Sequence, residues 1–153
     1  MESSSVVGRA VALADGARLG LDTAPVIYFV EAHPRYDALV TPVFQSIASG
    51  QWTGVTSVIT LTEVLTKPVR MGQTTLQLQY RYLLTASEHL ELVPIDAAVA
   101  ERAAVLRAQY DLRTPDALQV AAVQLAGCQA FLTNDSSLKR VTEIRVITMD
   151  DLV

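Results

Sequence analysis

Short apolar runs alternate along the chain with longer segments in which apolar residues recur every three or four positions. The short runs predict β-strands, and the longer segments predict amphipathic helices. Strands are expected at residues 17–21, 52–56, 90–95 and 145–149, and in the apolar run that ends just before Asp135. Strands that alternate with helices imply βαβ units, and therefore a parallel sheet that helices cover on both faces.

Proline and glycine mark where several of the predicted helices begin and end. Pro25 lies in the first turn of one helix, and Pro34 is expected to start the next, which Gly50 stops. Pro68 is expected to end the helix that Ser57 caps. Further helices are expected over residues 74–87 and 96–110, and from about residue 116 onward.

The composition is that of one globular domain. The chain has 153 residues, of which 50% are hydrophobic and 18% charged, so it is long and apolar enough to bury a sizeable core. Residues 1–17 are expected to form an N-terminal extension, with a short helix over 6–14, and residues 18–153 the folded domain.

Charge and cysteine content narrow the range of functions. The formal net charge of −4 argues against a broad positive face for duplex DNA. The single cysteine, Cys128, allows no internal disulfide and favours a reducing compartment. The apolar runs are too short to span a membrane, and the N-terminal segment lacks the continuous apolar stretch of a secretory signal. The sequence therefore predicts a cytoplasmic protein without a membrane partner.

Acidic residues lie at positions that a parallel sheet would bring to one edge. Asp22 and Asp135 each follow a predicted strand. Glu63 lies on the helix after the second strand, and Asp116 lies in the first turn of its helix. Because the ligands of such sheets bind beyond the carboxyl ends of the strands, these acids are expected to meet there.

Each acid also has a purely structural explanation. Asp22 and Asp135 can cap the turns that follow them. Asp116 can complement the dipole of a helix that Thr114 caps, and Glu63 fits a capping-box spacing. Only their joint placement at one edge favours a shared chemical function.

Carboxylates gathered in one place repel one another, and a shared cation removes that repulsion. Carboxylate ligands without a histidine or cysteine cluster favour hard divalent cations, Mg²⁺ or Mn²⁺. Such ions lower the pKa of a bound water and stabilise charge on a phosphate. The acids therefore predict a metal-dependent phosphodiesterase, although a phosphatase would need the same ligands.

The residues around these acids resemble those of the PIN-domain ribonucleases, and most of all the VapC-type toxins of type II toxin–antitoxin pairs. The resemblance runs from Leu19 to Thr148 and implies a three-layer α/β/α sandwich with a central, mostly parallel sheet of four to five strands. It rests on motifs in the family's order, which are Leu-Asp22-Thr-Ala-Pro-Val-Ile, Ile-Thr-Leu-Thr-Glu63-Val-Leu, Thr-Pro-Asp116-Ala-Leu-Gln-Val-Ala and Phe-Leu-Thr-Asn-Asp135.

The same resemblance implies roles for particular residues. The family's catalytic acids bind Mg²⁺ or Mn²⁺ and activate water for cleavage of structured RNA, often transfer RNA. They correspond here to Asp22, Glu63, Asp116 and Asp135. Thr133 matches the family's hydroxyl residue near the last acid, and Asn134 matches the common sequence there, so both are expected to support the site. Gln119 departs from the family, because many relatives have histidine at this position.

Cations near the acids in the sequence are candidates for contacts with RNA phosphates. These are Arg113, Lys139 and Arg140, each of which could equally be a solvated side chain near a helix end. The resemblance also implies a homodimer and a cognate protein antitoxin. The apolar helix at 26–30 and the helix face that carries Tyr80 are candidate contacts for either partner.

Several functions are compatible with the sequence. The first is a metal-dependent endoribonuclease that acts as a toxin and is neutralised by an antitoxin. The second is a non-catalytic PIN-like binding module, which the presence of all the acids argues against. The third is a phospho-accepting receiver domain, which also gathers acids at strand ends. A receiver needs a lysine at a later strand end, and neither Lys67 nor Lys139 directly follows a predicted strand.

Overall fold

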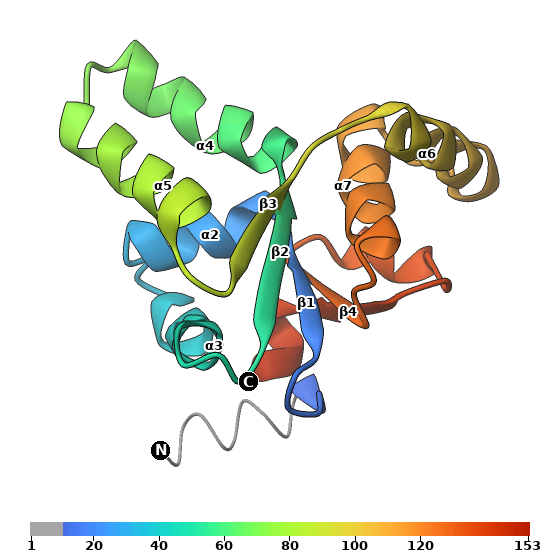
Figure 1. Ribbon diagram of the computed structural model, residues 1–153, viewed down its shortest axis with the longest axis horizontal. Coiled ribbons are helices and arrows are strands. Elements are labelled where there is room, and N and C mark those ends of the chain that lie inside the picture. The colour runs from blue at the N-terminus through green and yellow to red at the C-terminus, as the bar shows by residue number, and fades with distance from the viewer. Residues whose placement is uncertain (1–10) are drawn as a thin grey trace.

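The protein is built on a five-stranded sheet in which every neighbouring pair of strands is parallel (Figure 1). The computed structural model describes residues 11–153. The strands are β1 (Arg18–Leu21), β2 (Thr53–Ser57), β3 (Leu90–Val93), β4 (Ala130–Thr133) and β5 (Arg145–Thr148). Their order across the sheet is β3-β2-β1-β4-β5. The chain therefore runs outward from β1 to β3 on one side and from β4 to β5 on the other, which opens a crevice at the carboxyl ends of β1 and β4.

Helices cover both faces of the sheet, so the predicted three-layer α/β/α arrangement is confirmed (Figure 1). One side carries α2 (Thr23–Val30), α3 (Asp37–Ala48), α4 (Val58–Arg70) and α5 (Thr74–Ala86). The other side carries α6 (Ala97–Tyr110) and α7 (Thr114–Leu125). Short 3-10 helices, η1 (Ser136–Arg140) and η2 (Met149–Leu152), follow β4 and β5. Among residues 11–153, no helix has both the length and the apolarity needed to cross a lipid bilayer.

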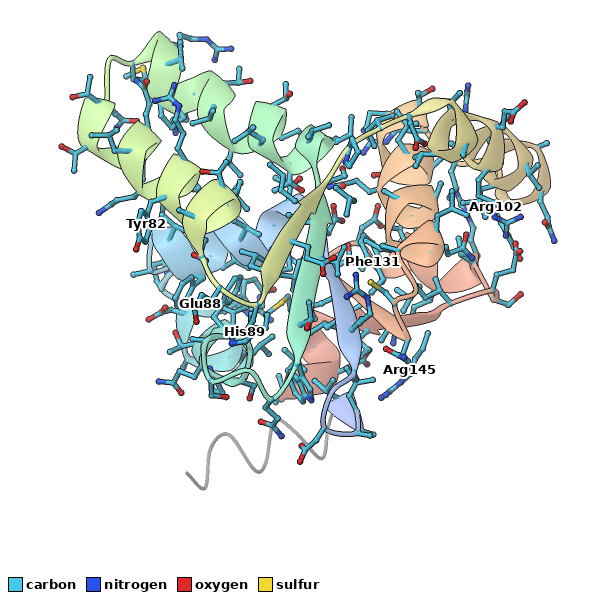
Figure 2. The ribbon with its side chains drawn as sticks, viewed as in Figure 1. Tyr82, Glu88, His89, Arg102, Phe131 and Arg145 are labelled. Carbon is cyan, nitrogen blue, oxygen red and sulfur yellow. The ribbon has the colours of Figure 1, made fainter. Side chains whose placement is uncertain are left out.

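Each face of the sheet has its own hydrophobic core, because side chains alternate between the faces along a strand. Leu19 and Leu21 of β1 pack on the side of α2 to α5, together with Leu132 of β4. Phe131, the neighbour of Leu132, packs on the opposite side against the cluster that includes Val120 of α7 (Figure 2). The alternation of apolar residues along each strand thus separates the two cores.

Two prolines do not set helix boundaries as the sequence suggested. Helix α3 begins at Asp37 instead of Pro34, because the intervening residues form a turn in which the His33 side chain accepts backbone hydrogen bonds. Pro68 does not end α4, which continues to Arg70. The Pro68 ring is buried in the last turns of the helix, which continues past the proline although it lacks a backbone donor.

The segment before β1 packs against the domain. Val11 and Ala17 are buried, and Leu13 lies against the same core. The Arg145 side chain of β5 donates a hydrogen bond to the carbonyl of Val11. Most of the helix expected over 6–14 lies outside the described residues, and the assignment of residues 1–17 as an extension stays a prediction.

Candidate active site

The predicted acids line one cleft at the carboxyl edge of the sheet. They come from four separate segments, namely the end of β1, helix α4, the first turn of α7 and the end of β4. The cleft has a volume of about 440 Å³. Its lining consists of Asp22, Thr23, Ala24, Ile27, Tyr28, Glu63, Arg113, Asp116, Thr133, Asn134 and Asp135. The structure therefore brings together the acids that the sequence singled out.

Asp22 follows β1 directly and caps α2. Its Oδ1 accepts a hydrogen bond from the backbone nitrogen of Thr23 (2.8 Å), and its Oδ2 accepts one from the hydroxyl of Thr133 (2.7 Å). Burial raises the pKa of Asp22 above its ordinary value, and the Asp116 and Glu63 carboxylates raise it further. The hydrogen bonds from Thr133 and Thr23 oppose this rise of the pKa without cancelling it. A cation in the cleft would stabilise the charged form of Asp22.

Glu63 reaches the cleft from α4 and is tied to α2. Its Oε1 accepts a hydrogen bond from the hydroxyl of Thr23 (2.5 Å), the residue after Asp22. Ser57 caps α4 by accepting from the backbone nitrogen of Ile59 (3.1 Å), so its predicted capping role is confirmed. The Glu63 carboxylate is therefore free of capping and faces the other acids.

Asp116 lies in the first turn of α7 and pairs with a neighbouring cation. The Nε of Arg113 lies 3.1 Å from its Oδ2. The prediction that Thr114 caps this helix is wrong, because Thr114 already has helical geometry and the extended Arg113 is the capping residue. The Arg113 side chain is 79% exposed, whereas that of Asp116 is 18% exposed. A pair with such an exposed partner contributes little to stability, because solvent screens it.

Thr133 connects the acids at the ends of β1 and β4. Its hydroxyl donates to Asp22 and accepts from the backbone nitrogen of Asp135 (3.0 Å). Asp135 in turn caps η1, since its Oδ1 accepts from the backbone nitrogen (3.0 Å) and the hydroxyl (2.6 Å) of Ser137. Both acids thus have the capping roles expected from the sequence while they line the cleft.

The donor set of the cleft fits a hard divalent cation, because it consists of carboxylate and hydroxyl oxygens. Within the part of the chain that the structure describes, however, no three acidic, histidine or cysteine side chains converge closely enough to hold a metal ion. Asp116 is instead directed toward Arg113 and Asp135 toward Ser137, whereas Glu63 contacts Thr23 through Oε1 alone. Binding a cation therefore requires rotation of the Asp116 and Asp135 side chains, and the release of Asp116 from an exposed arginine costs little.

Only one of the three cations predicted to contact RNA lines the cleft. Arg113 lines the cleft. Lys139 pairs with Asp151 of η2 (2.8 Å), and Arg140 donates to the backbone carbonyl of Asp111 (2.9 Å). Neither of these side chains lines the cleft, and their contact with RNA stays a prediction that would require an exchange of partners.

Sequence reasoning missed the parts that Thr23 and Tyr28 play in the cleft. Thr23 directly follows the first acid, so its position alone could have suggested a role. Tyr28 lies in an apolar helix that gave no such signal, yet its hydroxyl accepts a hydrogen bond from the Asn134 side-chain amide (2.6 Å). Asn134 is thereby shown to tie the end of β4 to α2.

A model of the PIN domain family matches residues 20–144. This chain belongs to the PIN domain family. The predicted resemblance is confirmed, and the receiver-domain alternative loses its support. PIN domains are generally nucleases, and these nucleases generally use divalent metal ions.

Solved structures of similar fold match most of this chain. VapBC2 from Rickettsia felis, bound to a DNA fragment from its promoter, has 18% sequence identity and a TM-score of 0.69, over 86% of this chain and 98% of that chain. A toxin–antitoxin complex from Klebsiella pneumoniae has 22% identity and a TM-score of 0.65, over 86% and 97%. FitAcB from Neisseria gonorrhoeae has 18% identity and a TM-score of 0.62, over 86% and 97%. No curated protein matched the sequence.

Proposed function

We propose that this PIN domain is a metal-dependent endoribonuclease. The observation that carries the proposal is the convergence of acids from four separate segments on one cleft, in a chain that belongs to a family of nucleases. The residues that would hold Mg²⁺ or Mn²⁺ are Asp22, Glu63, Asp116 and Asp135. A divalent cation bound there supplies Lewis-acid chemistry, which lowers the pKa of a water and stabilises negative charge on a phosphate.

The chain's own residues would position the reacting groups. Hydrolysis joins the oxygen of a water to phosphorus and breaks the bond to the leaving ribose oxygen, which gains a proton. A carboxylate of the cleft accepts the proton that the attacking water loses. Thr133 holds Asp22 and the start of η1 together, since its hydroxyl bonds to both. Arg113 stands at the cleft with an exposed guanidinium, which suits contact with a substrate phosphate.

The substrate class that we infer is structured RNA, with transfer RNA among the candidates. The test is incubation of a panel of structured RNAs with the protein in Mg²⁺, in Mn²⁺ or in a chelator. We expect cleavage with added cation and none in the chelator. Cleavage that continues in the chelator would overturn the metal dependence, and intact RNA under all conditions would overturn the nuclease assignment.

A non-catalytic PIN-like binding module is the second candidate, and two observations favour it. No three acids among the described residues converge on a metal position, and Arg113 already neutralises Asp116. Calorimetric titration with Mn²⁺ separates the candidates. Heat released or absorbed as Mn²⁺ binds to the folded protein would support the metal-dependent nuclease. A folded protein that binds no Mn²⁺ would support the non-catalytic binding module.

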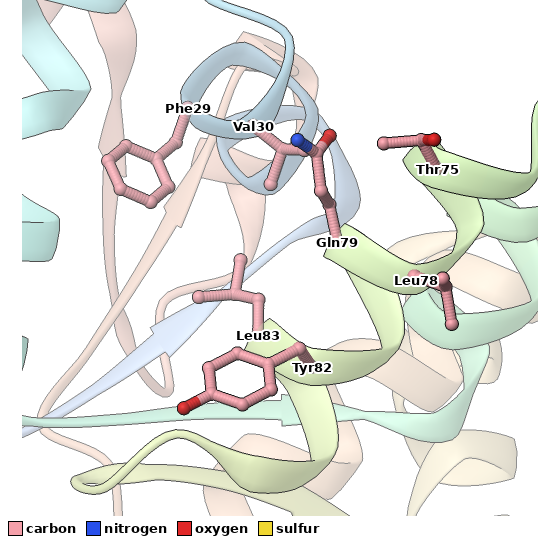
Figure 3. A pocket seen from close by; sticks show the side chains of 7 residues that line it. All are labelled: Phe29, Val30, Thr75, Leu78, Gln79, Tyr82 and Leu83. Atoms are coloured by element: carbon pink, nitrogen blue, oxygen red, sulfur yellow. The ribbon is translucent and has the colours of Figure 1, made fainter.

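We also propose that the protein is a toxin neutralised by a protein antitoxin, as in the solved toxin–antitoxin complex that it resembles. A surface suited to such a partner is the apolar hollow between α2 and α5 (Figure 3). It is lined by Phe29, Val30, Thr75, Leu78, Gln79, Tyr82 and Leu83. Leu78 is 64% exposed and Tyr82 70% exposed. Large exposed apolar side chains beside a hollow are typical of sites that receive the apolar face of a partner helix.

Leu78→Lys tests this surface. Expression of the wild-type protein is expected to arrest growth, and co-expression of a short neighbouring gene that encodes a DNA-binding protein is expected to relieve the arrest. The variant should still arrest growth, since Leu78 lies outside the acidic cleft, but relief should fail because a lysine charge would be desolvated in the interface. Arg81→Ala, an exposed change on the same helix, is the control. If co-expression relieved the growth arrest caused by Leu78→Lys as fully as the arrest caused by wild type, this surface would not be the antitoxin site.

The second partner that we propose is another copy of this chain, as the family resemblance implies. The purified protein without antitoxin is expected to form a homodimer. Light scattering during size-exclusion chromatography measures the mass directly. A mass of one chain at all concentrations would overturn this proposal and leave the nuclease proposal untouched.

A further inference from the structure

Gln119 lies beneath the acidic cleft, where three parts of the fold meet. Its side chain is on α7 and only 2% exposed. Its amide oxygen accepts a hydrogen bond from the hydroxyl of Ser57 (2.5 Å), and its amide nitrogen donates to the hydroxyl of Thr60 on α4 (2.7 Å). The same nitrogen lies 3.3 Å from the Thr23 hydroxyl and 3.5 Å from Oδ1 of Asp22. One buried amide therefore joins α7, α4 and the junction of β1 with α2.

The partners of Gln119 determine which end of its amide faces the cleft. The nitrogen, which carries the hydrogens, points toward the Asp22 carboxylate. The opposite orientation would place the amide oxygen against that carboxylate, which in its charged form can only accept hydrogen bonds. The Ser57 hydroxyl already accepts from a backbone nitrogen, so its hydrogen is available for the amide oxygen. The donor end of Gln119 is thus directed at the acids.

Thr23 extends this arrangement to a second acid. A hydroxyl has one hydrogen to donate and lone pairs with which to accept. Thr23 donates its hydrogen to Oε1 of Glu63 (2.5 Å). Its lone pairs are then left for donors, and the Gln119 amide nitrogen (3.3 Å) and the Thr60 hydroxyl (3.2 Å) lie within reach. Gln119 therefore acts directly on Asp22 and indirectly on Glu63.

We propose that Gln119 is a positioning residue of this site, whose amide holds Asp22 and, through Thr23, Glu63 in the orientation that receives a divalent cation. The inference rests on the proposed metal-dependent function. Groups that orient metal ligands from behind typically account for about 10–100-fold in metal affinity. A buried, fully hydrogen-bonded amide can have such an effect because it holds the carboxylates at fixed angles before the cation arrives.

Mn²⁺ affinity, measured from the electron paramagnetic resonance signal of the free ion, tests the proposal without reference to activity. Gln119→Met keeps the length and shape of the side chain and removes both polar atoms. We expect its dissociation constant for Mn²⁺ to be about 10-fold higher than that of wild type, or more. Thr23→Val is expected to show a similar loss, and Thr23→Ser, which restores the hydroxyl, is expected to recover the affinity.

Two further variants separate positioning from general damage to the fold. Because Gln119 acts on Glu63 through Thr23, the loss in the double variant Gln119→Met/Thr23→Val should be smaller than the product of the two single losses. Leu106→Ala removes a fully buried side chain from the core around α6, away from the cleft. It should lower the melting temperature and leave Mn²⁺ affinity unchanged.

Each contrary outcome has a distinct meaning. Equal Mn²⁺ affinity of wild type and Gln119→Met overturns the positioning role and leaves the nuclease proposal standing. A loss in Leu106→Ala as large as that in Gln119→Met also overturns it, because destabilisation alone would then explain the result. Absence of Mn²⁺ binding by the wild-type protein overturns the metal site itself.

Discussion

Asp22 combines a structural role with the chemical one proposed for it. It caps α2 through Oδ1 and receives the Thr133 hydroxyl at Oδ2. Burial raises the pKa of Asp22, so the folded protein holds this proton more tightly than the unfolded chain does. The stability that this group contributes is therefore present in acid, below the ordinary carboxyl range, and is lost as the pH rises through the raised pKa. At neutral pH the protein therefore gives up stability to keep Asp22 charged in the cleft.

Asp22→Asn is expected to raise the melting temperature of the metal-free protein at neutral pH. Asparagine is an equally good N-cap and carries no charge that burial would penalise. The gain should disappear in acid, where Asp22 itself is protonated. Thermal unfolding in a chelator at neutral and at acid pH measures both effects. A variant less stable than wild type at neutral pH would contradict the expected gain.

At the scale of elements, the sequence predicted the parts that depend on local pattern and chain order. Asp22 and Asp135 could be placed together because each follows a strand and parallel strands end at one edge. Gln119 and Thr23 meet across 96 residues of sequence, and such a contact depends on how α7 packs against the β1–α2 junction. Periodicity identifies the buried face of a helix but does not fix its height or angle on the sheet, so this contact could not be predicted.

Gly20 of β1 controls how closely α7 approaches the sheet. A Cβ atom at this position would lie 2.9 Å from the Cβ of Val123, well inside normal contact distance. Gly20→Ala is therefore expected to lower the free energy of unfolding by about 1–3 kcal/mol, as measured by denaturant titration. Adding Val123→Ala should restore part of the loss, because it removes the Cγ1 and Cγ2 atoms, which would lie 2.9 and 3.0 Å from the new Cβ, and leaves only the Cβ contact.

Gly54→Ala is the matched control for this prediction. Its Cβ would lie 2.8 Å from the Cδ1 atoms of Ile47 and Leu90, which are the ends of flexible side chains and can move aside. Gly54→Ala should therefore lower the free energy of unfolding by less than Gly20→Ala does. The reverse order would show that α7 can shift on the sheet without penalty, and would weaken the role assigned to its close approach.

The charge of the whole molecule fits a substrate that binds together with cations. The formal net charge is −4, and the proposed substrate is a polyanion. Two divalent cations in the cleft would give −4 + 4 = 0, which removes the overall repulsion. Cation binding is therefore expected to assist RNA binding as well as hydrolysis.

RNA cleavage by wild type, Asp116→Asn and Asp96→Asn in Mg²⁺ or Mn²⁺ tests most directly whether the acidic cleft is a metal-dependent ribonuclease site. Asp96 caps α6 by accepting from the backbone nitrogen of Val99 (3.0 Å) and does not line the cleft, and asparagine caps a helix equally well. We predict that wild type and Asp96→Asn cleave alike. Asp116→Asn should lose more than about 10-fold, since even groups behind a metal ligand are worth 10–100-fold. Equal cleavage by wild type and Asp116→Asn would contradict the claim.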